Sequence, residues 1–318
     1  MDDLLIRQHL NNTLIETNFS QLGTLYRGKV RDNYTLPDGR RIIIASDRLS
    51  AFDRVLTSIP FKGQLLNQMT NFWFEKTKKV VPNHVLDKPD PNVTVVQEAK
   101  PLPVEMVIRG YITGSAWRAY EKGEDVPDAN FPKGLKKNQQ LSTPVITPST
   151  KATSGHDEAI SKETILTKKI VPKTIYTQME EYTHTLYDAA SKICANNNII
   201  LVDTKYEFGL VGNKVIVIDE IHTPDSSRFW IKGTYEELFA EGKDPEILDK
   251  EFFRGWLMDH GYKGDGQPPI IPDDVRIELA QRYMKAFETI TGQTFKPVGG
   301  NVPIMERIQQ NLAKYFTK

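Results

Sequence analysis

The clearest hydrophobic pattern in the chain lies at residues 199–218. Two apolar runs, IILV and VIVI, are separated by a polar stretch and the Gly212-Asn213 turn. Apolar runs around a short Gly/Asn turn predict an antiparallel β-hairpin. Continuous apolar runs are typical of strands that are buried on both faces. We therefore expect the rest of the fold to be organised around this hairpin.

Charged residues interrupt the apolar pattern of the hairpin. Asp203, Lys205 and Glu207 alternate along the first strand and should share one face, and Asp219 ends the second run. Charges that are buried must be paired or must hold a metal ion. One interpretation is an exposed, salt-bridged hairpin. The other is a buried hairpin that holds Mg²⁺, which takes one or two carboxylates together with substrate phosphates; the apolar flanks favour this one.

A second hairpin is predicted nearer the N-terminus, where the Pro37-Asp38-Gly39 turn separates two strand-like runs. Gly28 precedes these runs at a point where the backbone could approach a ligand closely. Lys29 and Arg31 would share one face of the following strand. By itself this is the pattern of a basic edge strand. Together with an acid-bearing hairpin, it is also a pattern that holds ATP and Mg²⁺.

Two polar turns are candidate anion sites. Thr113-Gly114-Ser115 precedes a helix expected to start near Ala116, and Arg109 lies close by in the sequence. Free backbone N–H groups, a hydroxyl and a guanidinium suit a phosphate. The alternative is that Ser115 only caps the helix. The second turn, PDSSR, contains Asp225 and ends in Arg228, which is also suited to a phosphate or carboxylate.

The remaining pattern predicts a mixed α+β fold. Apolar periodicity predicts helices at 2–18, 61–77, 176–195, 271–292 and 302–316, proline-broken short strands at 80–102, a loop at 121–150, and helices and polar turns after residue 228. Pro101 and Pro103 suggest a domain border. We expect a β-rich N-terminal domain over 1–105 and a larger α/β domain with C-terminal helices over 106–318.

The composition narrows the class of protein. Lys+Arg and Asp+Glu each number 41, so the net charge is zero and gives no reason to expect nucleic-acid or membrane partners. The single cysteine, Cys194, excludes an internal disulfide, and we interpret it as a small buried hydrophobe. The N-terminus lacks a signal-peptide pattern, and no apolar run approaches membrane-spanning length. We expect a cytoplasmic protein.

Six segments, taken together, resemble the phosphoribosylaminoimidazole-succinocarboxamide synthase (SAICAR synthase) family in its longer form. They are LYRGKVRDNY, ASDRLSAFD, VIRGYITGSAW, TPSTKATSGHDE, LVDTKYEFG and IDEIHTPDSSR. The resemblance implies an ATP-grasp-like or kinase-like nucleotide site between a small β-rich N-terminal domain and a larger α/β domain. It also implies an ATP-dependent ligase that joins L-aspartate to carboxyaminoimidazole ribonucleotide (CAIR) in purine biosynthesis, as a monomer or small homo-oligomer.

The resemblance also implies roles for individual residues. Gly28, Lys29 and Arg31 would contact ATP, and Glu207 and Asp219 would hold Mg²⁺. The 5′-phosphate of CAIR would be bound by Arg109, Ser115 and Arg228, and its ribose by Asp225. Lys205 would lie near the carboxylate that is activated, with Asp203 beside it. Lys151 and the loop to His156 would form the aspartate neighbourhood, although a polar loop histidine such as His156 is usually only solvated.

Two other classes of protein could share these motifs. A non-catalytic regulator that binds a nucleotide or phosphosugar could keep the same hairpins, but loss of a metal acid or of the loop lysine would then be expected, and all three residues are present. A protein-kinase-type phosphotransferase would need an HRD-like catalytic loop and a DFG motif. The chain contains neither motif.

Overall fold

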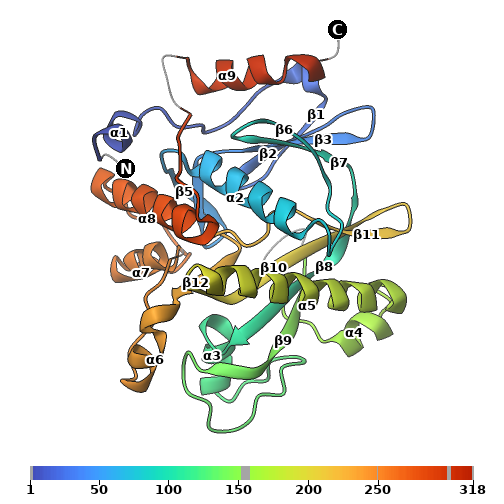
Figure 1. Cartoon of the computed structure of the whole chain (residues 1–318), viewed down its shortest axis with the longest axis vertical. Helices are drawn as coiled ribbons and strands as arrows, with labels where there is room; N and C mark the ends of the chain where they lie inside the picture. Colours follow the sequence, from blue (N-terminus) through green and yellow to red (C-terminus); the bar gives the residue numbers. More distant parts are fainter. Residues whose placement is uncertain (1–2, 152–157, 249, 299–301, 317–318) are drawn as a thin grey trace. The chain divides into compact units, whose positions relative to one another are not determined.

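The computed structural model describes residues 3–151, 158–248, 250–298 and 302–316. The chain forms two compact units. The first unit comprises residues 1–72, 84–98 and 249–318, and the second comprises 73–83 and 99–248. The expected α+β class is confirmed, because each unit combines an antiparallel sheet with helices (Figure 1).

The first unit is built on a five-stranded antiparallel sheet in the order β1-β2-β3-β7-β6. Its strands are β1 (Thr24–Arg27), β2 (Arg31–Thr35), β3 (Arg40–Ala45), β6 (Val85–Asp90) and β7 (Val93–Gln97). The predicted N-terminal hairpin is confirmed as β2 and β3, which pair from Arg31↔Ala45 to Thr35↔Arg41. A separate hairpin, β4 (Arg48–Ala51) with β5 (Arg54–Ser58), follows.

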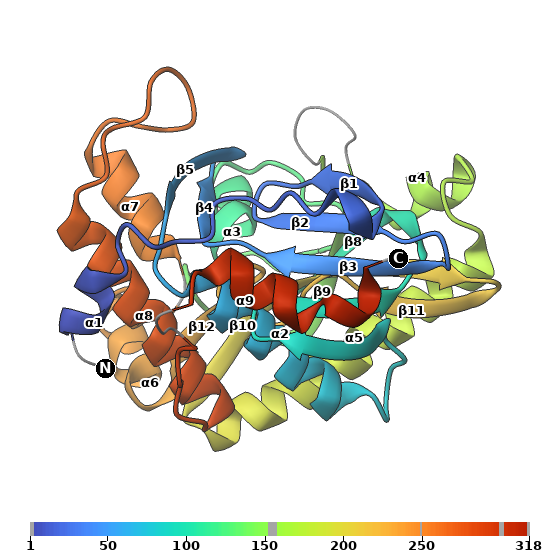
Figure 2. The same cartoon turned by 90° about the horizontal axis from the view of Figure 1, so that it is seen from above.

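The C-terminal helices belong to this first unit, which differs from the predicted division at residue 105. The helices are α1 (Asp3–Gln8), α7 (Glu251–Asp259), α8 (Asp273–Thr291) and α9 (Ile304–Asn311), with short turns η1 (Ser20–Leu22) and η2 (Ala313–Tyr315). In Figure 2, α9 lies along β3. Ile308 and Leu312 share one buried cluster with Tyr34, Ile42 and Val95 of the sheet. Burial of this apolar face joins the chain's C-terminal end to the N-terminal sheet.

The second unit is built around the predicted central hairpin, β10 (Ile199–Val211) and β11 (Lys214–Ile218). Its sheet has the order β11-β10-β8-β9, with β8 (Lys100–Tyr111), β9 (Gln140–Thr150) and β12 (Ser227–Ile231), the last also pairing with β10. One edge of β10 pairs with β8. The other edge pairs with β12 over residues 199–204 and with β11 over residues 207–211. The turn from 219 to 226 therefore lies beside β10 where β10 changes partner.

The second unit also contains helices. The helices are α3 (Gly114–Glu121), α4 (Lys162–Thr167), α5 (Lys173–Asn196) and α6 (Lys232–Ala240), while α2 (Lys62–Thr77) begins in the first unit and ends in the second. Helix α5 packs across β10 and β8 (Figure 1). Val202, Tyr206 and Phe208 of β10 are fully buried. Because side chains alternate, the neighbouring positions of β10 present their charges on the opposite face.

Three predictions from the sequence pattern were wrong. The expected loop at 121–150 contains β9, whose prolines Pro144 and Pro148 are tolerated because β9 lies at the end of the strand order of the sheet. The segment after Arg228 begins with β12 rather than a helix. The N-terminal helix ends at Gln8, and the chain then follows the first unit without regular structure, held by bonds from Leu14 N–H to Asp47 (2.7 Å) and from Thr17 N–H to Asp32 (2.6 Å).

Candidate active site

Three charged side chains lie in one row across adjacent strands of the second unit. Asp203 of β10 is the register partner of Arg109 on β8 and of Arg228 on β12. The Arg228 Nη1 group donates to Asp203 Oδ2 at 2.6 Å, and Arg109 Nη1 lies 3.3 Å from the same oxygen. We call these three residues the arginine row. The structure thus brings together two turns that lie far apart in the sequence.

The arginine row carries more positive than negative charge. Burial lowers the pKa of Arg109; Asp203 opposes this effect, while Arg228 and Arg118 lower the pKa further. Two guanidinium groups therefore share one carboxylate in a poorly solvated position. An anion bound beside the two guanidinium groups would favour their charged form.

Helix α3 begins beside the arginine row. Arg109 Nη2 lies 3.4 Å from Ser115 Oγ, and Arg109 Nε donates to Thr147 Oγ1 of β9 at 3.0 Å. The residue that caps α3 is Thr113, so the interpretation of Ser115 as a simple N-cap was wrong. Gly114 has a φ of +58°, and a Cβ there would lie 2.5 Å from the guanidinium of Arg228. Only glycine fits both the left-handed backbone and this close approach.

A second charged group, which we call the lysine cluster, lies further along the same face of β10. Lys205 Nζ donates to Glu207 Oε1 and to Glu105 Oε1 of β8, each at 2.7 Å. Lys151, at the end of β9, binds the second oxygen of Glu207. Glu105 and Glu207 are only 5% and 7% exposed. The predicted shared face of Asp203, Lys205 and Glu207 is thereby confirmed.

The carboxylates of the lysine cluster keep Lys205 charged. Burial by itself lowers the pKa of Lys205, but Glu207, Asp219 and Glu105 together raise it well above its usual range. These carboxylates therefore favour the ammonium form of Lys205. Asp219 directly follows β11, one residue after Ile218, the register partner of Glu207. Asp225 lies in the same connection, where its N–H donates to Thr223 Oγ1 at 3.3 Å.

The carboxylates Glu207 and Asp219 fit a magnesium ion by their chemistry, because Mg²⁺ favours oxygen ligands and needs few of them from the protein. In the part of the chain that the structure describes, no group of three or more His, Cys, Asp or Glu side chains is arranged to hold a metal. A magnesium ion here would thus depend on substrate phosphates as further ligands. Lys151 and Lys205 already place positive charge on Glu207, as a cation would.

The predicted nucleotide loop lies in the first unit, between β1 and β2. Gly28 N–H donates to Arg31 O at 2.8 Å and closes the loop. The Lys29 side chain is half-exposed and pairs with Asp53 in the turn between β4 and β5. Buried Arg48 holds the loop from behind, since it donates to Gly28 O and Lys29 O at 2.9 Å each.

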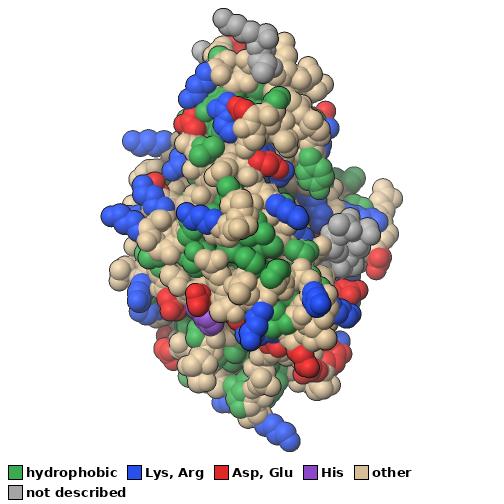
Figure 3. Space-filling model, turned by 90° about the vertical axis from the view of Figure 1, so that its right-hand side faces the viewer, with side chains coloured by type: hydrophobic (Ala, Val, Ile, Leu, Met, Phe, Trp, Pro, Cys, Tyr) green, Lys and Arg blue, Asp and Glu red, His purple; other side chains and the backbone are tan. Residues whose placement is uncertain are grey.

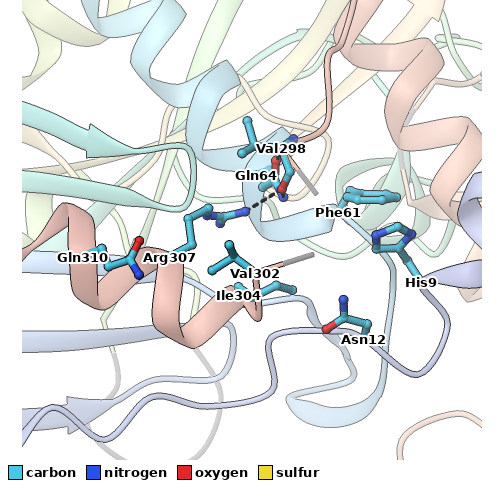
Figure 4. A pocket seen from close by; sticks show the side chains of 9 residues that line it. All are labelled: His9, Asn12, Phe61, Gln64, Val298, Val302, Ile304, Arg307 and Gln310. Atoms are coloured by element: carbon cyan, nitrogen blue, oxygen red, sulfur yellow. Dashed lines mark hydrogen bonds between the residues drawn. The ribbon is translucent and has the colours of Figure 1, made fainter. Parts of the chain in front are cut away.

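A pocket of about 240 Å³ also lies in the first unit (Figure 4). Its walls are formed by His9, Asn12, Phe61, Gln64, Val298, Val302, Ile304, Arg307 and Gln310. The guanidinium of Arg307 is already used by Asp90 at 3.0 Å and by Asn92 and Val298 O at 2.5 Å each. None of the predicted site residues lines this pocket, so the candidate chemistry stays with the arginine row and the lysine cluster.

Sequence reasoning missed two residues that support these groups. Glu105 lies in a mostly apolar segment, although an acid at this position and Arg109 alternate onto one face of β8. Nothing in the sequence neighbourhood of Arg48 indicates that it reaches the Gly28 loop. The segment from Lys151 to His156 is described only at Lys151, because 152–157 lie outside the described residues.

Comparison with known proteins identifies the family. The family model for SAICAR synthetase matches residues 24–269. The phosphoribosylaminoimidazole-succinocarboxamide synthases of Azobacteroides pseudotrichonymphae and Cytophaga hutchinsonii are 46% and 44% identical, over 92% and 95% of this chain and 91% and 99% of theirs. The structure of SAICAR synthase from Saccharomyces cerevisiae, complexed with SAICAR, is similar with a TM-score of 0.78 and 33% identity, covering 89% of this chain and all of that one. The chain therefore belongs to the SAICAR synthetase family.

Proposed function

We infer that this chain joins L-aspartate to the carboxylate of CAIR with the use of ATP, giving SAICAR, ADP and phosphate in purine biosynthesis. Family membership supports the reaction, and the yeast relative was solved with SAICAR, the product of this ligation. The observation that carries the proposal within this structure is the arginine row. Two arginines on one carboxylate, with a serine hydroxyl at 3.4 Å from Arg109, form a position where a phosphate group could be bound.

The reaction needs an activated carboxylate because a carboxylate is a poor electrophile. A carboxylate oxygen of CAIR attacks the γ-phosphorus of ATP, and the bond from that phosphorus to the β–γ bridging oxygen breaks, releasing ADP. The amine of aspartate then attacks the carbonyl carbon of the acyl phosphate. The C–N bond forms, phosphate leaves with the electrons of the C–O bond, and the nitrogen loses a proton. Such transfers depend on positioning and charge neutralisation more than on a protein nucleophile.

Each group of residues takes one part of this chemistry. Arg109, Arg228 and Ser115 bind the 5′-phosphate of CAIR, and Asp225 binds its ribose. Asp203 lies beside Lys205 on β10 and orients the two arginines. Lys205, held as an ammonium ion by Glu105 and Glu207, neutralises the carboxylate while it is phosphorylated. The Gly28-Lys29 loop, with Arg31 nearby, binds the ATP phosphates.

Two further assignments concern the lysine cluster. Glu207 and Asp219 hold Mg²⁺, which when bound neutralises the charge of the ATP phosphates. Lys151, at the start of the segment that leads to His156, contributes to the binding of aspartate. Both assignments extend the resemblance to side chains that the structure places beside Lys205.

The remaining predictions concern partners and location. Among the described residues, no helix is long and apolar enough to cross a membrane. On the face drawn in Figure 3, Lys and Arg side chains are interspersed with Asp and Glu side chains rather than gathered in the positive stripe that nucleic-acid binding requires. We propose a cytoplasmic location and a monomer or small homo-oligomer without nucleic-acid or membrane partners.

A substrate-omission assay tests the proposed function. Purified chain is mixed with ATP, Mg²⁺, CAIR and aspartate, and both ADP and the succinocarboxamide product are measured while each component is left out in turn. We expect product only in the complete mixture. Product formed without aspartate, or no ADP release in the complete mixture, would contradict the proposal. A Lys29→Ala variant should show weaker ATP kinetics with unchanged direct binding of CAIR.

A further inference from the structure

The strand at the centre of the arginine row contains a β-bulge. On β12, Phe229 and Arg228 are neighbours, but their partners on β10 are Leu201 and Asp203. Val202 is therefore an extra residue without a partner on β12. A bulge of this kind changes which face the following side chains occupy, since a shift of one residue reverses the alternation.

The bulge decides which residue of β12 lies level with Asp203. With the bulge, Asp203 lies level with Arg228 and Arg109 on the face that carries Lys205 and Glu207. Without it, Val202 would pair with Arg228 and Asp203 with Ser227, so Arg228 would move out of the row. The arginine row thus depends on a feature of the backbone of β10, not only on its three side chains.

The hydroxyl of Tyr187 on α5 holds the bulge from the covered face of the sheet. It donates to Leu201 O at 2.7 Å and lies 3.3 Å from Val202 O, so it contacts the carbonyls on either side of the irregularity. Tyr187 is only 4% exposed, and burial raises the pKa of its phenol above the usual range, which keeps it a donor. The Val202 side chain is fixed as well, since it packs with Tyr111, Trp230 and Tyr235.

Gly110 on β8 provides the room for this hydroxyl. A Cβ at position 110 would lie 2.1 Å from Tyr187 Oη and 3.2 Å from the ring carbon that carries it. The first distance is a severe overlap, whereas the second is a tight contact. Any larger side chain at 110 would therefore push the hydroxyl away from Leu201 O. Gly110 directly follows Arg109, so β8 contributes both a residue of the arginine row and the space for the Tyr187 hydroxyl.

We propose that Tyr187 and Gly110 are positioning residues for phosphate recognition, because together they fix the β10 bulge that sets Asp203 between Arg109 and Arg228. Neither residue is part of the arginine row itself, and neither has been given a role in the proposed function. The inference rests on the proposed function in one respect, namely that the arginine row binds the phosphate of CAIR. Their effect should be on CAIR affinity rather than on ATP or on turnover.

Steady-state kinetics of three variants test this inference. Tyr187→Phe removes the hydroxyl but keeps the ring, and we expect the KM for CAIR to rise about tenfold, equivalent to about 1.4 kcal/mol. The KM for ATP should stay within about twofold and kcat should change less than the KM for CAIR, whereas a loss of folded protein alone would lower kcat and leave both KM values unchanged. Tyr176→Phe is the matched control, because Tyr176 is a buried tyrosine about three turns earlier on α5 and should leave both KM values unchanged.

The steric part of the inference predicts a rescue. Gly110→Ala should raise the KM for CAIR at least as much as Tyr187→Phe does. When both substitutions are combined, the hydroxyl that clashes is absent and the nearest Tyr187 atom is the ring carbon at 3.2 Å. The double variant should therefore resemble Tyr187→Phe rather than show the product of the two effects.

The outcomes separate the inference from the proposed function. An inactive wild-type protein in the complete assay would contradict the proposed function. An active wild-type protein whose Tyr187→Phe variant keeps the wild-type KM for CAIR would overturn the inference alone. Multiplicative effects in the double variant would overturn the shared steric cause. If Tyr187→Phe does not fold, Gly110→Ala alone still decides: a higher KM for CAIR with an unchanged KM for ATP would support the inference, and an unchanged KM for CAIR would overturn it.

Discussion

This chain contains two arginine–aspartate groups that differ in how far they are closed off from solvent. In the first unit, Asp32 accepts bonds from Thr17 N–H (2.6 Å), Thr17 Oγ1 (2.9 Å) and Arg48 Nη2 (2.9 Å). Arg48 donates its other N–H groups to the carbonyls of Ile15, Gly28 and Lys29. The side chains of Arg48 and Asp32 are 6% and 1% exposed. Every strong polar contact of this pair lies within the protein.

The arginine row of the second unit is more open to solvent. Arg109 and Arg228 share a single oxygen of Asp203, and their side chains are 12% and 20% exposed. The row contains two positive charges for one negative charge. The comparison teaches how a structural ion pair can be told from a binding group. The first is closed off from solvent, whereas the second keeps its guanidinium groups partly exposed, where a ligand can reach them.

The largest expected effect is on the stability of the first unit. Arg48→Met leaves the buried carboxylate of Asp32 without its main partner, and losing one partner of a buried pair costs about 3–5 kcal/mol. Urea unfolding should show this loss as a lower midpoint. Direct binding of CAIR to protein that is still folded should be unchanged. A variant as stable as wild type would contradict the view that this pair holds the fold.

The next effect is on catalysis in the lysine cluster. Glu207→Gln removes an anionic oxygen from the proposed magnesium site and should lower kcat by about a hundredfold or more with the fold kept. Glu180→Gln is the control, since Glu180 also binds a lysine, Lys162, at 2.7 Å. ADP release across a Mg²⁺ titration measures both variants. Wild-type turnover of Glu207→Gln at every Mg²⁺ concentration would show that the metal assignment is wrong.

A smaller effect concerns pH and a second buried acid of the first unit. Burial raises the pKa of Asp47 from 3.8 to about 6, although bonds from Gly63 and Leu14 N–H oppose the rise. Between these two values the unfolded chain has lost the proton and the folded chain retains it, so the free energy of unfolding should fall as the pH rises. At about 1.4 kcal/mol per pKa unit, the total loss is at most about 3 kcal/mol.

Urea unfolding between pH 4 and 7 measures this dependence. The contribution of Asp47 is fully present below its unfolded pKa and is lost as the pH rises through about 6. Asp47→Asn cannot ionise and should remove this component of the slope. A slope that Asp47→Asn leaves unchanged would mean that other groups cause it.

The smallest effect expected is on the arginine row, and it sharpens the comparison most. Arg109→Ala and Arg228→Ala should each weaken CAIR binding at least tenfold, about 1.4 kcal/mol, measured by calorimetry. Because both arginines share Asp203 and, on our proposal, one phosphate, the double variant should depart from additivity. ATP binding should change far less. Arg282→Ala, which removes the partner of Glu278 in the first unit, is the control.

Local patterns predicted much of this fold. The α+β class, both hairpins and helices α5 and α8 follow from apolar periodicity and from turn residues, including Gly292 with its φ of +68° at the end of α8. Strands β9 and β12 were missed because prolines disguise the first and a polar start disguises the second. The place of α9 was missed because its contacts are with a sheet at the other end of the chain.

The candidate site was predicted in part. The motifs shared with the SAICAR synthase family contain Arg109, Asp203 and Arg228, and the structure brings these three residues together. The bulge at Val202 could not be predicted, since a bulge depends on the register of a partner strand. The roles of Lys29, Asp219, Asp225 and Lys151 stay predictions, because the described contacts give their surroundings and not their ligands.

One pair of substitutions tests the central claim, which is that the closed pair of Arg48 and Asp32 stabilises the fold while the arginine row binds substrate. Asp32→Asn and Asp203→Asn are made in parallel, and both the free energy of unfolding and the affinity for CAIR are measured for each. We predict that Asp32→Asn lowers stability by about 3 kcal/mol with CAIR affinity kept. Asp203→Asn should weaken CAIR binding at least tenfold, about 1.4 kcal/mol, and should lower stability less than Asp32→Asn does. The reverse pattern, or equal losses of stability with unchanged CAIR affinity in both variants, would contradict the claim.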